Sequence, residues 1–306
     1  MKKGRPPKDP SKLAIYLAEK AEAHKAQVKE DIVELNKSII YTDNPNETEE
    51  DVVLRIRERF EIMWKCAHGT TTGAVRSLIV SGAGGVGKTY TIEDILSSAY
   101  TNAEIKSEVV HGVLTPVNLY KLLYRNRFAN NVVVLDDADS IFNDDQALSV
   151  LKAALDSGTK RKISWLAEGK SLKNQKDGEV PTDFMYEGSM IFITNLDFQK
   201  LVDMGKSKHV PHMQALMTRA IYIDLKLHTV KDLTAWIRHI VTKECKVKGT
   251  GWDGISVEQT NEILDFIAEN GNKLRNLSIR TVTKMAAFVK MVGADWKTMA
   301  ETTEFR

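Results

Sequence analysis

Cysteine is scarce in this chain of 306 residues, which has only Cys66 and Cys245, and long apolar runs are missing altogether. No stretch approaches the roughly 18 apolar residues of a membrane span, so we expect no membrane partner. The basic N-terminus has no apolar segment behind it, which argues against a secretion signal. The two cysteines are therefore expected to be reduced thiols in a cytoplasmic compartment.

Charge of one sign is not in excess either, because 43 lysines and arginines face 41 aspartates and glutamates, for a net charge of +2. Any contact with nucleic acid must therefore be local. The first twelve residues, MKKGRPPKDPSK, are the basic exception, and their three prolines exclude a helix before Ser11.

The segment Gly4-Arg5-Pro6 of this basic arm resembles an AT-hook, whose arginine lies in a narrow A·T minor groove. The arm over residues 1–12 is thus a candidate nucleic-acid contact through its basic residues from Lys2 to Lys8. A solvated basic tail is the alternative.

A helical extension with an acidic linker is expected over residues 13–51. Apolar residues cluster near both ends of the stretch 13–39, and acidic residues with Pro45 follow it. The middle of the stretch is too polar for a helix that lies on a membrane surface. Packing on a partner protein, packing on a neighbouring subunit and a solvated helix all stay open.

The stretch from Arg76 to Thr91 carries the most specific motif. An apolar run, Leu78-Ile79-Val80, leads through the glycine-rich sequence GAGGVGKT into a helix-compatible segment. Strand, loop and helix in this order fit the phosphate-binding pattern G-x-x-x-x-G-K-[ST], in which glycines let backbone N–H groups surround a phosphate. Lys88 is expected to reach the β- and γ-phosphates of ATP, and Thr89 to offer its hydroxyl to Mg²⁺. The residues predicted to bind the nucleotide are Gly82, Ala83, Gly84, Gly85, Val86, Gly87, Lys88 and Thr89.

A second buried strand, NVVVLDD at residues 131–137, ends in two carboxylates. In a parallel sheet this end and the phosphate loop lie at the same edge. Asp136 is then expected to hold Mg²⁺ together with Thr89, and Asp137 to polarise the attacking water. Asp139 is a further carboxylate nearby.

Strands and helices alternate between residues 52 and 227, and the strands are apolar runs. This pattern predicts an α/β core with a parallel sheet covered by helices on both faces. From Thr229 onward the pattern is helical only, with N-caps expected at Thr229, Ser256 and Ser278. A small all-helical domain is therefore expected over residues 228–306.

The order of these motifs resembles that of the AAA+ ATPase family, over roughly Val52 to Met291. The resemblance rests on the phosphate loop, the strand ending in Asp136-Asp137, the strand ending in Thr194-Asn195, and Arg219 before a short strand. It implies that Asn195 is sensor 1, which orients the water, and that Arg219 is the finger that reaches a neighbour's γ-phosphate. A ring or open spiral of subunits, with ATP at their interfaces, follows from that role.

The resemblance also implies that the C-terminal helical domain is a lid that carries sensor 2. Arg280, near the start of the helix after Ser278, is the first candidate, and Arg275 is the second. One departure is Asp137, where most AAA+ members have Glu. The Asp-Asp pair followed by Ala is similar to the superfamily-three viral helicases, but those lack the separate lid expected here.

The segment from Lys160 to Gly188 is longer than a minimal connection, and residues 161–166 and 183–186 are expected to be two arms of a hairpin. Three lysines lie between them, Lys170, Lys173 and Lys176. In DNA-handling AAA+ branches such a hairpin points lysines into the ring pore, where they contact phosphates. A mobile surface loop with solvated lysines is the alternative.

The expected function is an AAA+ ATPase that couples ATP hydrolysis to movement or remodelling of a nucleic-acid complex. Two alternatives stay open: a protein remodeller, and an ATP-switched loader of a protein partner that barely hydrolyses ATP. The compact layout with a short basic arm resembles a replication accessory protein of a phage or mobile element, which implies the host-cell cytoplasm.

Overall fold

The computed structural model of the chain describes most of its length. The described residues are 47–102, 105–158, 160–166, 172–174, 178–205, 210–227, 229–244 and 251–306. The basic arm over residues 1–12, most of the expected N-terminal extension, and Cys245 lie outside them.

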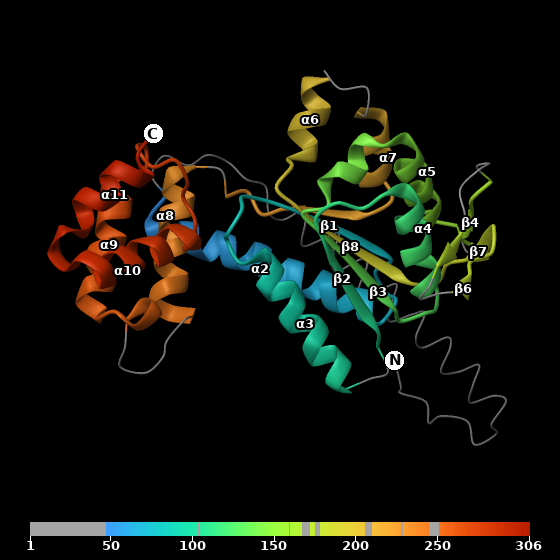
Figure 1. Ribbon diagram of the computed structural model, residues 1–306, viewed down its shortest axis with the longest axis horizontal. Coiled ribbons are helices and arrows are strands. Elements are labelled where there is room, and N and C mark those ends of the chain that lie inside the picture. Colours follow the sequence, from blue (N-terminus) through green and yellow to red (C-terminus); the bar gives the residue numbers. More distant parts are fainter. Residues whose placement is uncertain are drawn as a thin grey trace, which may run out of the picture.

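The centre of the molecule is a parallel five-stranded sheet with the strand order β2-β3-β8-β1-β9 (Figure 1). Its strands are β1 (Ser77–Ser81), β2 (Ser107–His111), β3 (Val132–Asp136), β8 (Ser189–Thr194) and β9 (Ile221–Asp224). Strand β8 lies between β1 and β3, so the loops that follow these three strands leave the same edge of the sheet side by side. This arrangement brings the three predicted motifs together.

Helices surround the sheet and form a separate group beside it (Figure 1). Those of the core are α2 (Glu49–Thr71), α3 (Lys88–Asn102), α4 (Pro116–Arg125), α5 (Asp145–Ala154), α6 (Phe198–Met204) and α7 (Val210–Met217), with a 3₁₀ turn η1 (Asp139–Asn143). Those beside it are α8 (Val230–His239), α9 (Val257–Asn270), α10 (Ile279–Val292) and α11 (Trp296–Glu304). Three short helical turns are η2 (Ile240–Glu244), η3 (Trp252–Gly254) and η4 (Gly293–Asp295).

Both faces of the sheet are buried, because alternate residues of each strand point to opposite sides. In β1, Ile79 packs into one apolar core, and Leu78 and Val80 pack into another. Helices α4, α5 and α7 close the first core, and α2, α3 and α8 close the second. The predicted α/β fold, a parallel sheet with helices on both faces, is confirmed.

Helix α2 begins at a reciprocal capping box formed by Thr48 and Asp51, and it continues to Thr71. The hydroxyls of Thr70 and Thr71 donate to carbonyls three residues earlier, at 2.7 and 2.8 Å, and both residues are buried, which stabilises this last turn.

The four C-terminal helices pack around an apolar core of their own, and we call them the lid. The capping boxes predicted at Thr229 and Ser256 are confirmed. Ser278 stands at the N-cap of α10 as expected, but its side chain makes no capping hydrogen bond. Helix α8 joins the two parts of the molecule, because Trp236 packs into the sheet core and the next residue, Ile237, into the lid core.

The predicted boundary near residue 227 falls between the last strand, which ends at Asp224, and α8, which begins at Val230. The domain limits themselves stay a prediction. In the described part of the chain, no helix combines the length and the apolar character that crossing a membrane requires.

Candidate functional site

The loop between β1 and α3 has the backbone conformation that the glycine pattern predicts. Gly85 and Gly87 have φ angles of +69° and +105°, in the left-handed region that residues with a side chain rarely adopt. A Cβ at Gly85 would also lie 2.9 Å from Ser278 Cβ of the lid. We call residues 82–87 the phosphate loop. Glycine is therefore required at position 85 by both backbone conformation and space, and at position 87 by backbone conformation.

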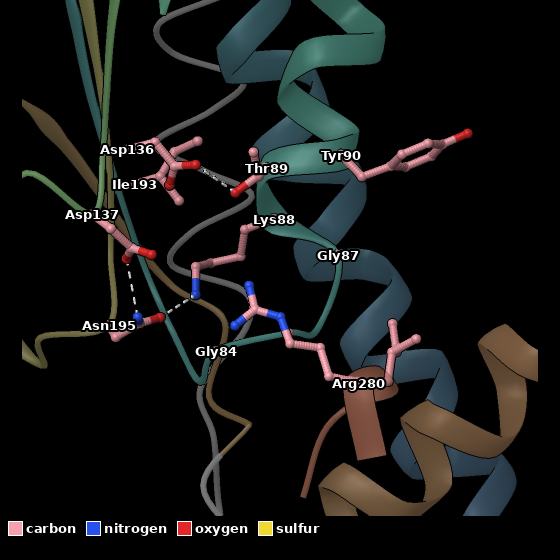
Figure 2. A pocket seen from close by; sticks show the side chains of 12 residues that line it. Gly84, Gly87, Lys88, Thr89, Tyr90, Asp136, Asp137, Ile193, Asn195 and Arg280 are labelled. Carbon is pink, nitrogen blue, oxygen red and sulfur yellow. Dashed lines mark hydrogen bonds between the residues drawn. The ribbon is translucent and has the colours of Figure 1, made fainter. Parts of the chain in front are cut away.

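Lys88, the first residue of α3, is directed toward the edge of the sheet. Its Nζ donates to the carbonyls of Gly82 and Ala83 at 2.7 and 2.8 Å, and to Asn195 Oδ1 at 2.9 Å (Figure 2). The residue is only 5% exposed, and this burial lowers the pKa of its ammonium group from 10.5 to about 8. A buried cation of this kind gains from an anion that enters the loop.

The two residues predicted to hold a metal ion are in contact. Thr89 Oγ1 donates to Asp136 Oδ2 at 2.9 Å, across the gap between α3 and the end of β3 (Figure 2). Hard oxygen donors of this type fit Mg²⁺, which commonly takes one or two carboxylates and completes its shell with water and phosphate oxygens. Within the described residues, no group of three or more His, Cys, Asp or Glu side chains is placed to hold a metal.

His111 is a member of this edge that the sequence analysis did not single out. Its Nδ1 lies 3.2 Å from Asp136 Oδ2, because β2 pairs with β3 in a register that sets the two residues opposite each other. The available signal in the sequence was a polar residue at the end of a short run that contains Val109 and Val110.

Asp137 and Asn195 extend the network from the loop to the next strand end. Asn195 Nδ2 donates to Asp137 Oδ1 at 3.0 Å, so the amide links the carboxylate to Lys88 (Figure 2). Asp137 has a φ of +51°, and its backbone N–H donates to Ile193 O at 3.0 Å, which holds this turn against β8. Both side chains are exposed and accessible to a water molecule.

The carboxylate of Asp139 is held by a hydrogen bond from a neighbouring strand. Thr194 Oγ1 donates to Asp139 Oδ1 at 2.6 Å, and the same hydroxyl accepts the N–H of Leu196 at 2.9 Å. Burial raises the pKa of the Asp139 carboxyl. This pair fixes the backbone that carries Asn195.

The structure separates the two sensor 2 candidates. Arg280, on the first turn of α10, lines the pocket formed by the phosphate loop, and its side chain points from the lid toward Lys88 (Figure 2). Arg275 instead binds the C-terminal end of the chain. Its side-chain Nε donates to Phe305 O at 2.7 Å, and its backbone N–H donates to Glu304 O at 2.8 Å. Arg280 is thus placed at the site and Arg275 is not.

Arg219 is exposed and lies near the N-terminal ends of the parallel strands, on the side of the sheet opposite the phosphate loop. Its carbonyl accepts a hydrogen bond from Ser77 Oγ at 2.9 Å, at the start of β1. The phosphate loop follows the other end of β1, about 13 Å away at the usual rise per residue. Arg219 therefore does not line the pocket at the phosphate loop of its own subunit. This position is compatible with the expectation that it acts on the nucleotide of a neighbouring subunit.

A second cavity adjoins the phosphate loop, with a volume of about 720 Å³. It lies between α2, the start of α3 and the lid, and most of its side chains are apolar or aromatic. Its lining includes Phe60, Trp64, Tyr90, Trp236, Trp252 and Ile279. The pocket at the loop itself has a volume of about 250 Å³ and is lined by charged and polar groups as well. The pocket at the phosphate loop thus continues into an aromatic one, with Gly87, Tyr90 and Ile279 lining both.

The hairpin predicted before sensor 1 is present at its base. Strands β4 (Lys162–Ser164) and β7 (Asp183–Met185) pair antiparallel. Trp165 at the end of β4 is only 6% exposed, with its ring 5.8 Å from that of Tyr120 on α4. The tip carries a smaller hairpin of β5 (Lys173–Asn174) and β6 (Gly178–Glu179). Lys173 lies in β5, whereas Lys170 and Lys176 lie outside the described residues.

Comparison with known proteins found a relative in enterobacteria phage T4, the "uncharacterized 36.7 kDa protein in nrdC-mobD intergenic region". It is 33% identical over 261 residues, which are 85% of this chain and 78% of the phage protein. No protein-family model matches the chain.

Two similar solved structures are AMPPCP-bound DnaA from Aquifex aeolicus and PCH-2 from C. elegans. The DnaA structure has a TM-score of 0.46 and 12% sequence identity, and the aligned region covers 85% of this chain and 69% of the DnaA chain. The PCH-2 structure has a TM-score of 0.37 and 12% sequence identity, and the aligned region covers 79% of this chain and 64% of the PCH-2 chain.

Proposed function

The chain belongs to the family of the phage T4 protein. From its parallel sheet and the phosphate loop at one end of that sheet, we propose that it is an AAA+ ATPase that hydrolyses ATP to move or remodel a nucleic-acid complex. The observation that carries the ATPase proposal is one chain of contacts. Hydrogen bonds of 2.9 and 3.0 Å join Lys88 at the start of α3 to Asn195 after β8, and Asn195 to Asp137 after β3. A lysine for phosphate, an amide and a carboxylate for water are the groups that phosphoryl transfer to water requires.

Each residue has a proposed role that follows from its position. Lys88 turns its ammonium group from the loop carbonyls to the β- and γ-phosphates. Asn195 orients the attacking water, and the Asp137 carboxylate accepts its proton. Arg280 contributes positive charge from the lid to the phosphates of its own subunit.

Mg²⁺ fits the oxygen donors at the end of β3. Asp136 and the hydroxyl of Thr89 would hold the ion, directly or through water, and the ion would supply positive charge that neutralises the phosphates. The protein's own part is to keep these two oxygens 2.9 Å apart and to close the site with the lid.

The aromatic cavity supports a nucleotide rather than a simple polyphosphate as the ligand. It opens beside the phosphate loop, and the aromatic side chains that line it include Phe60, Trp64 and Trp252. Stacking on such side chains suits a purine base. The base, sugar and phosphates of one ATP would then lie along the seam between core and lid.

The position of Arg219 supports an assembly of subunits. It is exposed at an edge of the sheet from which it cannot reach its own phosphate loop, so a role in hydrolysis requires a second copy of the chain. A ring or spiral with ATP at the interfaces would meet that requirement.

The nucleic-acid part of the proposal depends on the basic arm and the hairpin. The alternative that a hairpin aromatic residue grips a polypeptide loses support, because Trp165 is buried against α4. A nucleotide-switched loader of a protein partner stays the second candidate, since the shorter carboxylate of Asp137 is compatible with slow turnover.

The test is the rate of ATP hydrolysis at increasing protein concentration, alone and with single- or double-stranded DNA. We expect a rate that rises more than linearly with protein and rises again with DNA, and no turnover by Lys88→Ala. A linear rate that ignores DNA would remove the nucleic-acid coupling and favour the loader.

A further inference from the structure

Two groups of the lid donate hydrogen bonds to consecutive carbonyls of the phosphate loop. Trp236 Nε1, on α8, donates to Val86 O at 3.0 Å. The backbone N–H of Ile279, the first residue of α10, donates to Gly85 O, also at 3.0 Å. The two donors belong to different lid helices, so the lid holds the loop at two adjacent peptide groups.

The geometry of a peptide group links these carbonyls to the anion site. In a planar trans peptide the C=O and the N–H point in opposite directions. A carbonyl of Gly85 that faces the lid therefore directs the N–H of Val86 away from it, and the carbonyl of Val86 does the same for the N–H of Gly87. Neither N–H donates to another group in the described part of the chain. N–H groups of this kind are what a phosphate loop offers to its ligand.

The lid donors are rigidly placed. Trp236 is only 4% exposed, and its ring stacks on that of Phe60 with centroids 4.7 Å apart. Val86 is fully buried, so its carbonyl would lose its partner without access to water. The lid also touches the loop at Gly85, where a Cβ would lie 2.9 Å from Ser278 Cβ.

We propose that Trp236 and the Ile279 amide are positioning groups for the phosphate loop, through which the lid orients the N–H groups that bind the polyphosphate. This inference rests on the proposed nucleotide site and adds a link to it. Because the lid and the ligand act on the same peptide groups, lid placement and phosphate affinity are thermodynamically coupled, and each influences the other by the same factor.

The first test replaces the donor and keeps an aromatic ring, with Trp236→Phe. Pyrophosphate and ATP are the two ligands, and their dissociation constants are measured by calorimetry. Loss of one oriented hydrogen bond should weaken both ligands by a similar factor of roughly five to ten. Weaker ATP binding with unchanged pyrophosphate binding would overturn the proposal, because it would assign Trp236 to the base alone.

A matched control is Trp296→Phe, at another buried tryptophan of the lid. Trp296 is 3% exposed and its ring lies 5.2 Å from that of Phe266 in the lid core, away from the phosphate loop. This variant should leave pyrophosphate affinity unchanged. An equal loss of pyrophosphate affinity in both variants would refute a specific role for Trp236.

A second pair covers the case in which Trp236→Phe does not fold. Ile279→Pro removes the N–H at the first position of a helix, where proline is well tolerated, and the preceding Ser278 already has the extended backbone that proline favours. Ile279→Val keeps the N–H. We expect weaker pyrophosphate binding in the first variant only, and equal binding in both would contradict the proposal.

Two results distinguish failure of the proposed nucleotide site from failure of the link between lid and phosphate loop. A wild-type protein that binds neither ATP nor pyrophosphate would overturn the proposed function and this inference with it. If the wild type binds pyrophosphate and both Trp236→Phe and Ile279→Pro bind it equally tightly, the inference about the lid is overturned and the proposed function is not.

Discussion

Nucleotide affinity should fall by about tenfold between pH 7 and pH 9, because of the buried position of Lys88. Burial lowers the pKa of its ammonium group from 10.5 to about 8 in the protein before nucleotide binds. About nine-tenths of the lysines are then protonated at pH 7, and about one-tenth at pH 9. A phosphate anion favours the protonated form and raises the pKa in the complex, so binding takes up a proton. Affinity therefore decreases as the pH rises through 8.

Isothermal titration calorimetry with ADP, from pH 7 to 9.5 at constant ionic strength, measures this dependence. The last ionisation of a phosphate is largely complete above pH 7, so the ligand contributes little to the slope. Titrations in two buffers with different ionisation enthalpies should give an uptake of about half a proton at pH 8.

The control is Lys88→Arg, whose guanidinium stays charged over the whole range. Its affinity will differ from that of the wild type, but it should not change with pH. A wild-type affinity that is constant from pH 7 to 9.5, or a decline that Lys88→Arg reproduces, would refute the reasoning.

Three further predictions concern other parts of the molecule. Arg219→Ala should abolish ATP turnover and leave ATP binding largely intact, since this residue lies at the far edge of its own sheet; normal hydrolysis would remove the finger assignment. Arg280→Ala should lower kcat for ATP hydrolysis by at least tenfold, whereas Arg275→Ala, its matched control, should leave kcat unchanged; equal effects would reject the sensor 2 assignment. Trp165→Ala should reduce the free energy of unfolding in urea by about 3–5 kcal/mol, because it empties a buried ring site; a loss below about 1 kcal/mol would show that the hairpin base is not packed as described.

Local patterns in the sequence predicted much of the fold correctly. The apolar runs before the phosphate loop and before Asp136 are strands because alternate residues are buried on two faces. The capping boxes at Thr229 and Ser256 could be predicted because a capping box joins residues only three positions apart. Ser278 shows the limit of this reading, since it occupies the N-cap position and yet packs against the phosphate loop.

The candidate site was predictable where a motif fixed the chemistry. Lys88, Thr89, Asp136, Asp137 and Asn195 follow strands or open a helix, and parallel strands bring such ends to one edge. Their contacts in the structure agree with that placement. Their roles in hydrolysis stay predictions until the variants are measured.

The sequence by itself therefore determined the type of fold, the phosphate loop and the strand ends that face it, because each is encoded within a few neighbouring residues. Only the tertiary structure decided that Arg280 rather than Arg275 lines the pocket, and that Trp236 bonds to Val86. The two residues of that last pair are 150 positions apart in the chain. Such contacts depend on how the lid packs on the sheet core, and no local pattern of residues specifies that packing.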